Sequence, residues 1–324
     1  MPFRLRITLI FLALLLLAVV TIPLIYPVTD LTATPLRQLA GTDASFADVD
    51  GIDLHYSDSG SAPPTLLLLH GFGSSTFGWR KLEAPLSREA RVIAFDRPGF
   101  GFSERSLVTG SSNPYTPEAQ VTLTLGLMGR LNVQRAVLLG SSEGAAVAVG
   151  VALAAPERVA GLILIGPALS SSGPPAWVRP LFNTPQATRM GPVIMRQFAE
   201  DPGRELLRRA YADPERLTEA DIVGFERPWQ SPDWDRALWE VTKANGSTDL
   251  FPKLGSLNVP TLVVTGAEDG IVPPEVSRRA ADTIPDATFE SLADCGHVPQ
   301  EECPQKFLGA VMPWLNSLQV SAKN

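Results

Sequence analysis

The sequence predicts an α/β fold: a mostly parallel, doubly wound sheet with a helical insertion late in the chain and an apolar helix at the amino terminus. Short apolar runs alternate with helical stretches from Phe46 onward, and each run is continuous in Val, Leu and Ile. Such runs are typical of strands that helices cover on both faces. The 324 residues are 45% hydrophobic and 19% charged, which is enough apolar material for a substantial core. The predicted strands are residues 65–69, 91–95, 137–139, 162–165 and 261–265.

The amino-terminal helix is predicted from residues 7–26, which are almost wholly apolar and follow Arg4 and Arg6. About twenty such residues can span a bilayer. A secretory signal is the alternative, but no A-x-A-like cleavage site follows, so a retained anchor is favoured. The positive charges precede the span and the first charge after it is Asp30. The positive-inside tendency therefore places the remaining chain outside the cytoplasm, membrane-anchored or, if the segment is cleaved, secreted.

Strand-like runs are absent between residues 167 and 246, where helical stretches separated by prolines predict a cap. This region holds four of the six tryptophans, at positions 177, 229, 234 and 239. Most should pack the cap onto the core, and some should line an apolar pocket between the two. The predicted division is an anchor or signal segment (1–27), a Thr- and Pro-rich linker (28–44), a core in two parts (45–166 and 247–324) and the cap (167–246).

Charge and cysteine content exclude several classes of protein. The formal net charge is −7 and no run of Lys and Arg exceeds two residues, so nucleic acid is not an expected partner. The two cysteines, Cys295 and Cys303, are too few for a disulfide framework and have no metal-ligand spacing with histidines. Their pairing stays open, with unbonded thiols favoured. We expect neither a metal nor an organic cofactor.

Residues 140–144, Gly-Ser-Ser-Glu-Gly, lie between an apolar strand and an Ala-rich helical stretch. In the G-x-S-x-G pattern the serine occupies a tight strand-to-helix turn, and the glycines relieve the crowding around its exposed hydroxyl. The frame selects Ser142, because centring the pattern on Ser141 would put Leu139 and Glu143 where glycines are needed. Ser142 is therefore the predicted nucleophile.

Two further motifs follow predicted strands: His-Gly-Phe-Gly at residues 70–73 and Asp-Arg-Pro-Gly-Phe-Gly at residues 96–101. With the serine turn, they closely resemble the α/β-hydrolase superfamily over about residues 46–315. The resemblance implies an oxyanion hole formed by the backbone N–H groups of Phe72 and Glu143. Each preorganised donor of this kind contributes about 2.7–4 kcal/mol to acyl transfer. The Glu143 carboxylate should turn aside, because its charge would repel the oxyanion.

A serine hydroxyl needs a base to accept its proton and an acid to orient that base. The chain has three histidines. His55 lies in an early hairpin-like region, and a structural role is favoured for His70 at the start of the oxyanion loop. His297 lies in a loop that resembles the one carrying the family's catalytic histidine, and it comes last in the order Ser, Asp, His. His297 is therefore the predicted base.

Asp269, just after the strand at 261–265, is the predicted orienting acid. Glu268 is adjacent, but the family's G-x-x-D frame aligns Asp269. Some family members take the acid from an earlier loop, yet no Asp or Glu occurs between Glu157 and Glu200. Asp294, near the histidine, is expected to be a turn former.

The resemblance implies a serine hydrolase that cleaves carboxylic esters through an acyl-enzyme, and the anchor and apolar cap favour apolar or lipid-like acyl groups. Haloalkane dehalogenases and epoxide hydrolases resemble the chain but use aspartate where it has Ser142. Carbon–carbon bond hydrolases use serine but commonly carry Trp after the histidine, where this chain has Val298. That activity, cofactor-free perhydrolysis and non-catalytic ligand binding remain alternatives.

Overall fold

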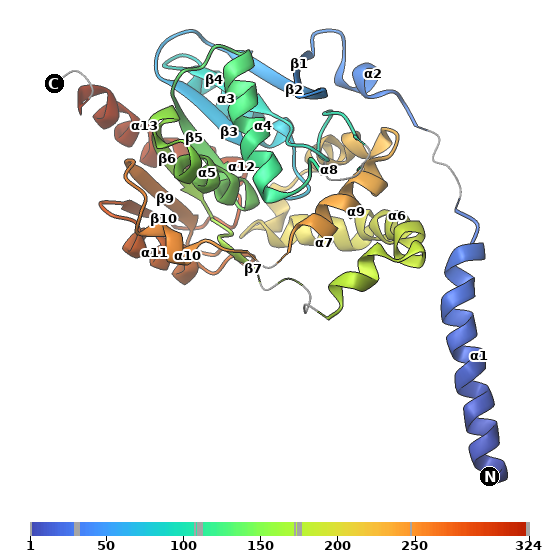
Figure 1. The fold of residues 1–324 in the computed structure, drawn as a ribbon. Helices are drawn as coiled ribbons and strands as arrows, with labels where there is room; N and C mark the ends of the chain where they lie inside the picture. Colours follow the sequence, from blue (N-terminus) through green and yellow to red (C-terminus); the bar gives the residue numbers. More distant parts are fainter. Residues whose placement is uncertain are drawn as a thin grey trace.

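The computed structural model describes residues 2–28, 33–106, 108, 113–171, 173, 177–246 and 248–321. Its centre is an eight-stranded sheet in the order β1-β2-β4-β3-β5-β6-β9-β10 (Figure 1). Strands β1 and β2 pair antiparallel at one edge, β2 pairs antiparallel with β4, and the remaining pairs are parallel. The predicted mostly parallel sheet is confirmed. The strands are β1 Ser45–Val49, β2 Ile52–Ser59, β3 Thr65–Leu69, β4 Arg91–Phe95, β5 Ala136–Ser141, β6 Val159–Ile165, β9 Thr261–Gly266 and β10 Thr288–Leu292.

Helices cover both faces of the sheet, which explains the unbroken apolar runs. In β3, Leu67 and Leu69 belong to the core cluster that includes side chains from α4 (Pro117–Arg130), α5 (Glu143–Ala154) and α11 (Pro274–Thr283). Leu66 and Leu68 belong to the cluster that includes side chains from α3 (Arg80–Leu86) and α13 (Pro304–Ser321). Alternate side chains of a strand point to opposite faces of the sheet. All four leucines are buried because helices cover both faces. Shorter elements are η1 Thr76–Trp79, η2 Pro156–Arg158, α10 Phe251–Leu254 and α12 Pro299–Glu302.

Between β6 and β9 the chain is mainly helical, within the region where the sequence predicts an insertion. We call residues 177–246 the helical segment. Its elements are η3 Arg179–Asn183, α6 Pro185–Ala199, α7 Asp201–Arg209, η4 Pro214–Arg216, α8 Glu219–Glu226, η5 Arg227–Gln230 and α9 Trp234–Ala244. A short antiparallel pair, β7 Ser170–Ser171 with β8 Thr248–Asp249, joins the two ends of the insertion. Trp234 and Trp239 are buried here with Phe100 and Tyr115, so they pack the helical segment onto the sheet and its covering helices, which we call the sheet domain.

The amino-terminal helix α1 (Phe3–Ile25) projects from the body of the protein, and the short α2 (Leu36–Ala40) precedes β1 (Figure 1). Helix α1 contains no buried residue. Within the described part of the chain it is the one helix long and apolar enough to cross a membrane, and a signal sequence would meet the same criterion.

Candidate active site

The serine turn predicted from the Gly-x-Ser-x-Gly pattern is present between β5 and α5. Ser142 has φ 54° and ψ −116°, a backbone conformation that non-glycine residues seldom adopt. The flanking glycines are required by close approach. A Cβ at Gly144 would lie 2.1 Å from the carbonyl oxygen of Leu69, and one at Gly140 would lie 2.5 Å from Cα of Ala145. The turn therefore packs directly onto β3, with the serine at the carboxyl end of the sheet.

His297 and Asp269 form a buried pair. Nδ1 of His297 lies 2.8 Å from Oδ2 of Asp269, and each residue is 6% exposed. The other carboxylate oxygen accepts hydrogen bonds from the backbone N–H groups of Ile271 (2.9 Å) and Val272 (2.8 Å). A carboxylate acceptor at Nδ1 favours the tautomer with the proton on that nitrogen, which leaves Nε2 as a base. The neighbouring Glu268 is exposed, whereas Asp269 is the carboxylate that contacts the imidazole.

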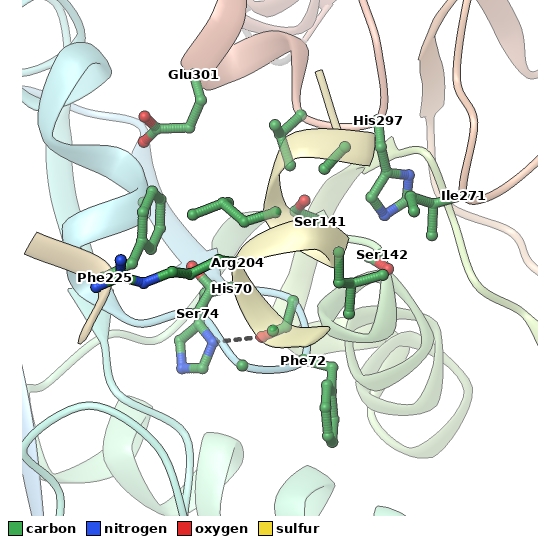
Figure 2. Close-up of a pocket in the computed structure, with 18 of the residues that line it drawn as sticks. His70, Phe72, Ser74, Ser141, Ser142, Arg204, Phe225, Ile271, His297 and Glu301 are labelled. Carbon is green, nitrogen blue, oxygen red and sulfur yellow. Dashed lines mark hydrogen bonds between the residues drawn. The ribbon is translucent and has the colours of Figure 1, made fainter. Parts of the chain in front are cut away.

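The end of β6 brings the serine turn and the His–Asp pair together. The Ser142 N–H donates to the carbonyl of Ile165 at 2.8 Å. A Cβ on the next residue, Gly166, would lie 3.0 Å from both Nδ1 of His297 and Oδ2 of Asp269. In Figure 2 the imidazole points toward the Ser142 hydroxyl, and both residues line one cavity. The three side chains selected from the sequence thus converge at one place.

His70 is unsuited to act as a base because both of its ring nitrogens are engaged. Its Nδ1 donates to the carbonyl of Gly71 at 2.8 Å (Figure 2), and its Nε2 accepts the backbone N–H of Arg97 at 3.0 Å. Burial, with the nearby Arg97 charge, lowers the pKa of His70 to about 3. His70 is a neutral structural residue. Asp294 has a positive φ of 55° and pairs with Lys306, as expected of a turn former.

The two N–H groups predicted for an oxyanion hole are both unengaged. Within the described residues, neither the Phe72 N–H nor the Glu143 N–H donates a hydrogen bond. Glu143 is the first residue of α5, where helical geometry leaves the N–H without an internal partner and the helix dipole favours negative charge. Phe72 lies in the loop after β3 and lines the cavity.

The Glu143 carboxylate turns aside, as predicted. It accepts a hydrogen bond from Arg97 at 2.5 Å and another from the side-chain amide of Asn245, at the end of the helical segment. Arg97 is fully buried and also donates to the carbonyl of His70 at 2.9 Å and to Gln120. One guanidinium therefore ties the loop before Phe72 to the start of α5. The Asp-Arg-Pro-Gly-Phe-Gly motif did not predict this role of Arg97.

The loop that carries His297 is closed by a disulfide. The interpretation of Cys295 and Cys303 as unbonded thiols is wrong: the two residues are bonded, with their Cα atoms 6.2 Å apart. The chain folds back through α12 and brings together two cysteines that are eight positions apart. Spacing alone does not reveal this return. Glu302 also holds the loop, by accepting the N–H groups of Gly296 (2.6 Å), Ala212 (3.0 Å) and Asp213 (2.9 Å).

Comparison with known proteins settles the family. The sequence model described as alpha/beta hydrolase fold matches residues 64–304. The chain belongs to the α/β-hydrolase family. The uncharacterized hydrolase YugF of Bacillus subtilis is 32% identical, over 79% of this chain and 92% of its own length. A 2-hydroxy-6-oxononadienedioate/2-hydroxy-6-oxononatrienedioate hydrolase of Paraburkholderia phymatum is 30% identical, over 81% and 90%. A thermophilic esterase from Thermogutta terrifontis is 27% identical, with a TM-score of 0.65 over 90% and 98%.

The cavity of this α/β-hydrolase has a volume of about 180 Å³ and lies between the sheet domain and the helical segment. Ser142 and His297 lie on one side of it, and Arg204 and Phe225 lie on the other (Figure 2). Of the four tryptophans noted in the sequence, one, Trp229, contributes to the wall. The apolar side chains of the lining are those of Phe72, Trp79, Phe198, Leu206, Leu207, Ala210, Phe225, Trp229, Leu238, Ile271 and Val298.

The charged groups of the cavity are paired. Among the described lining residues Arg204 is the one arginine or lysine, and it donates to both carboxylate oxygens of Glu226 at 2.6 and 2.8 Å. Glu301 accepts from Arg80 at 2.6 Å and is also close to Lys81. Burial raises the pKa of Glu301 to about 7, against the lowering effect of these two cations. The cavity thus offers apolar walls and no unpaired guanidinium or ammonium among these residues.

Proposed function

We propose that this hydrolase cleaves carboxylic esters with apolar acyl groups, using Ser142 as nucleophile, His297 as base and Asp269 as orienting acid. The observation that carries the proposal is the 2.8 Å hydrogen bond between His297 and Asp269 beside the serine turn, at the wall of an apolar cavity. Activation of a serine needs this combination of base and orienting acid.

In the proposed mechanism, Nε2 of His297 takes the proton of the Ser142 hydroxyl while the oxygen attacks the ester carbonyl. The N–H groups of Phe72 and Glu143 stabilise the oxyanion of the tetrahedral intermediate. Asp269 stabilises the imidazolium, which then gives its proton to the departing alkoxide and leaves an acyl-enzyme. Water, deprotonated by the same imidazole, releases the carboxylic acid and restores Ser142. We propose that the helical segment, as the predicted cap (167–246), keeps bulk water from the acyl group.

Neutral substrates suit the cavity better than dianionic ones. A dienedioate, the substrate type named for the Paraburkholderia relative, carries two carboxylates. Burying a carboxylate without a cationic partner costs several kcal/mol, and Arg204 is already neutralised by Glu226. Val298, and not the tryptophan usual in carbon–carbon bond hydrolases, follows the histidine. Dienedioate hydrolysis is the second candidate, favoured by the 30% identity to that relative.

The test is labelling with a fluorophosphonate, followed by turnover of p-nitrophenyl esters of increasing acyl length and of a dienedioate. The native chain should be labelled, Ser142→Ala should not, and the matched control Ser141→Ala should keep the label. Medium-length esters should be hydrolysed and the dienedioate should not. Equal labelling of native chain and Ser142→Ala would end the proposed mechanism, and preferred turnover of the dienedioate would favour the second candidate.

We also propose that α1 is a retained anchor and that the catalytic domain lies outside the cytoplasm. Two arginines precede the apolar stretch, and the Cys295–Cys303 disulfide suits an oxidising compartment. The mass of the mature protein from membranes tests retention, and protease accessibility in spheroplasts tests orientation. A mass lacking residues 1–27 would point to secretion.

A further inference from the structure

Helix α6 lies beside the carboxyl-terminal part of α1 (Figure 1). The side-chain amide of Gln186 donates to the carbonyl of Val20 at 3.3 Å, and Arg189 donates to the carbonyl of Tyr26 at 3.0 Å. At 1.5 Å per residue, Val20 lies about 8 Å before the end of α1 at Ile25. The 23 residues of α1 extend about 35 Å, slightly more than the ~30 Å hydrocarbon layer of a bilayer. If α1 spans a membrane, the start of α6 lies at the boundary between the acyl chains and the lipid headgroups.

The chain around α6 has a composition unlike the rest of the protein. Although the whole chain has a net charge of −7, residues 158–199 contain no Asp, Glu or Lys. They contain four basic side chains, all arginine. Arg158 lies in η2, before β6, and Arg196 is paired with Asp235, so Arg179 and Arg189 are the two that bear on the region around the start of α6. This stretch is locally cationic within an acidic protein, so it is electrostatically complementary to an anionic surface.

Large apolar side chains are exposed in the same stretch. Trp177 is 77% exposed, Leu181 is 55% exposed and Ile194, on α6, is 51% exposed. Arg179 and Arg189 are exposed as well. We call these five residues the α6 face. Segments that lie in the headgroup region of membranes combine tryptophan and aliphatic side chains with arginine, and they contain few acidic residues.

We propose that the α6 face rests on the surface of the anionic bilayer that α1 crosses. In this arrangement Trp177, Leu181 and Ile194 enter the boundary between headgroups and acyl chains, and the two arginines lie near lipid phosphates. An arginine near an anionic surface stabilises the membrane-bound state through its attraction to the lipid phosphates. The protein would therefore contact the membrane through the α6 face as well as through α1. This second contact would fix the orientation of the domain relative to the bilayer.

The docked stretch continues into the wall of the cavity. Phe198, near the end of α6, lines the cavity, and so does Leu206 of α7, which is also 38% exposed. An ester dissolved in the bilayer would thus be adjacent to the cavity wall. This consequence, unlike the docking itself, rests on the proposed esterase activity.

The experiment uses the full chain reconstituted in vesicles of phosphatidylcholine with phosphatidylglycerol. An environment-sensitive NBD label is attached at Ile194→Cys or Leu181→Cys; the native cysteines are paired and do not compete. The matched control is Arg130→Cys, an exposed residue at the end of α4. The chain there leads to the amino end of β5, which is the end of that strand opposite the serine turn. Spin-labelled lipids should quench both face labels and not the control, and NBD emission should move to shorter wavelength only at the face.

Quenching at positions 181 and 194 no stronger than at 130 would overturn the proposal, since α1 would then hold the domain away from the lipid. Equal quenching in pure phosphatidylcholine and in the anionic mixture would overturn the anionic preference. A second measurement follows hydrolysis by Leu181→Glu/Ile194→Glu, which alters no cavity-lining residue. Hydrolysis of an ester presented in vesicles should fall several-fold, while hydrolysis of a soluble short-chain ester stays at the native rate. An inactive native chain would refute the esterase proposal and leave the quenching result standing.

Discussion

Two buried His–Asp pairs with almost the same geometry occur in this protein, and their surroundings separate them. Nδ1 of His297 lies 2.8 Å from Asp269, and Nδ1 of His55 lies 2.7 Å from Asp96. His297 lines the cavity together with Ser142. The ring of His55 instead lies between the rings of Phe46 and Phe102, 5.3 and 5.5 Å away. A His–Asp hydrogen bond by itself therefore does not indicate a catalytic pair. The groups around the rest of the imidazole ring distinguish a catalytic pair from a structural one.

Each acid accepts two backbone N–H groups besides its imidazole, but the donors to Asp96 come from two separate loops. Asp96 accepts hydrogen bonds from His55 and from the backbone N–H groups of Thr76 (2.6 Å) and Phe102 (2.7 Å). Burial disfavours its charge, but the hydrogen bond and charge of His55, with smaller contributions from His70 and the Phe102 N–H, together outweigh burial and lower the pKa of Asp96 to about 2. A Cβ on Gly101 would lie 1.9 Å from the Asp96 carboxyl carbon. This pair closes the turn after β4 and is a structural clamp.

The largest effect should come from removing His297. His297→Ala leaves Ser142 without a base, so we expect kcat for an ester to fall by about 10⁴-fold or more. The thermal unfolding midpoint should change little, because the side chain of His297 faces a cavity. Steady-state kinetics and a melting curve on the same sample check this. A fall below tenfold would mean that a different base serves Ser142.

The converse should hold for the clamp. His55→Ala removes one partner of a buried pair and leaves Asp96 uncompensated, so the free energy of unfolding should fall by about 3 kcal/mol. In the protein that remains folded, kcat should stay within a few-fold of the native value. Urea unfolding and active-site titration with a fluorophosphonate separate the two quantities. A large fall in kcat per titrated site would instead show that His55 takes part in catalysis and that the pair is not purely structural.

The sequence distinguished the two histidines, His297 and His55, only through their order in the chain and the motifs around them. Strand Thr65–Leu69 and the turn at Ser142 follow from local rules, since buried leucine runs and flanking glycines reflect packing that each residue experiences directly. The His55–Asp96 bond was not predicted, because it joins β2 to the end of β4, 41 positions apart. Long-range side-chain contacts of this kind depend on strand order, which the apolar runs do not encode.

The Cys295–Cys303 disulfide was missed for a more local reason, because a separation of eight residues does not reveal that the chain folds back through α12. It provides the next test of the comparison. It closes the loop around His297, whereas the clamp at His55 has no covalent restraint among the described residues. Cys295→Ser/Cys303→Ser should lower the free energy of unfolding by about 2–3 kcal/mol. It should also lower kcat by up to about 100-fold through misplacement of the imidazole. Kinetics before and after dithiothreitol treatment of the native chain provide the control, and unchanged kcat in both would show that Glu302 alone holds the loop.

Titration sharpens the comparison through the most gradual effect, a change in stability that is spread over several pH units. Asp96 has a lowered pKa, so its contribution to stability is complete above pH ~4 and is lost as the pH falls toward about 2. Glu301, four residues after His297, has a raised pKa of about 7, so the sign is opposite. Between pH ~4.5 and 7 the unfolded chain has lost this proton while the folded protein retains it. Stability should therefore fall with rising pH, by up to about 1.4 kcal/mol per pH unit from this group. Glu301→Gln should remove that slope in urea unfolding from pH 5 to 8, and an unchanged slope would show that Arg80 keeps the carboxylate ionised throughout.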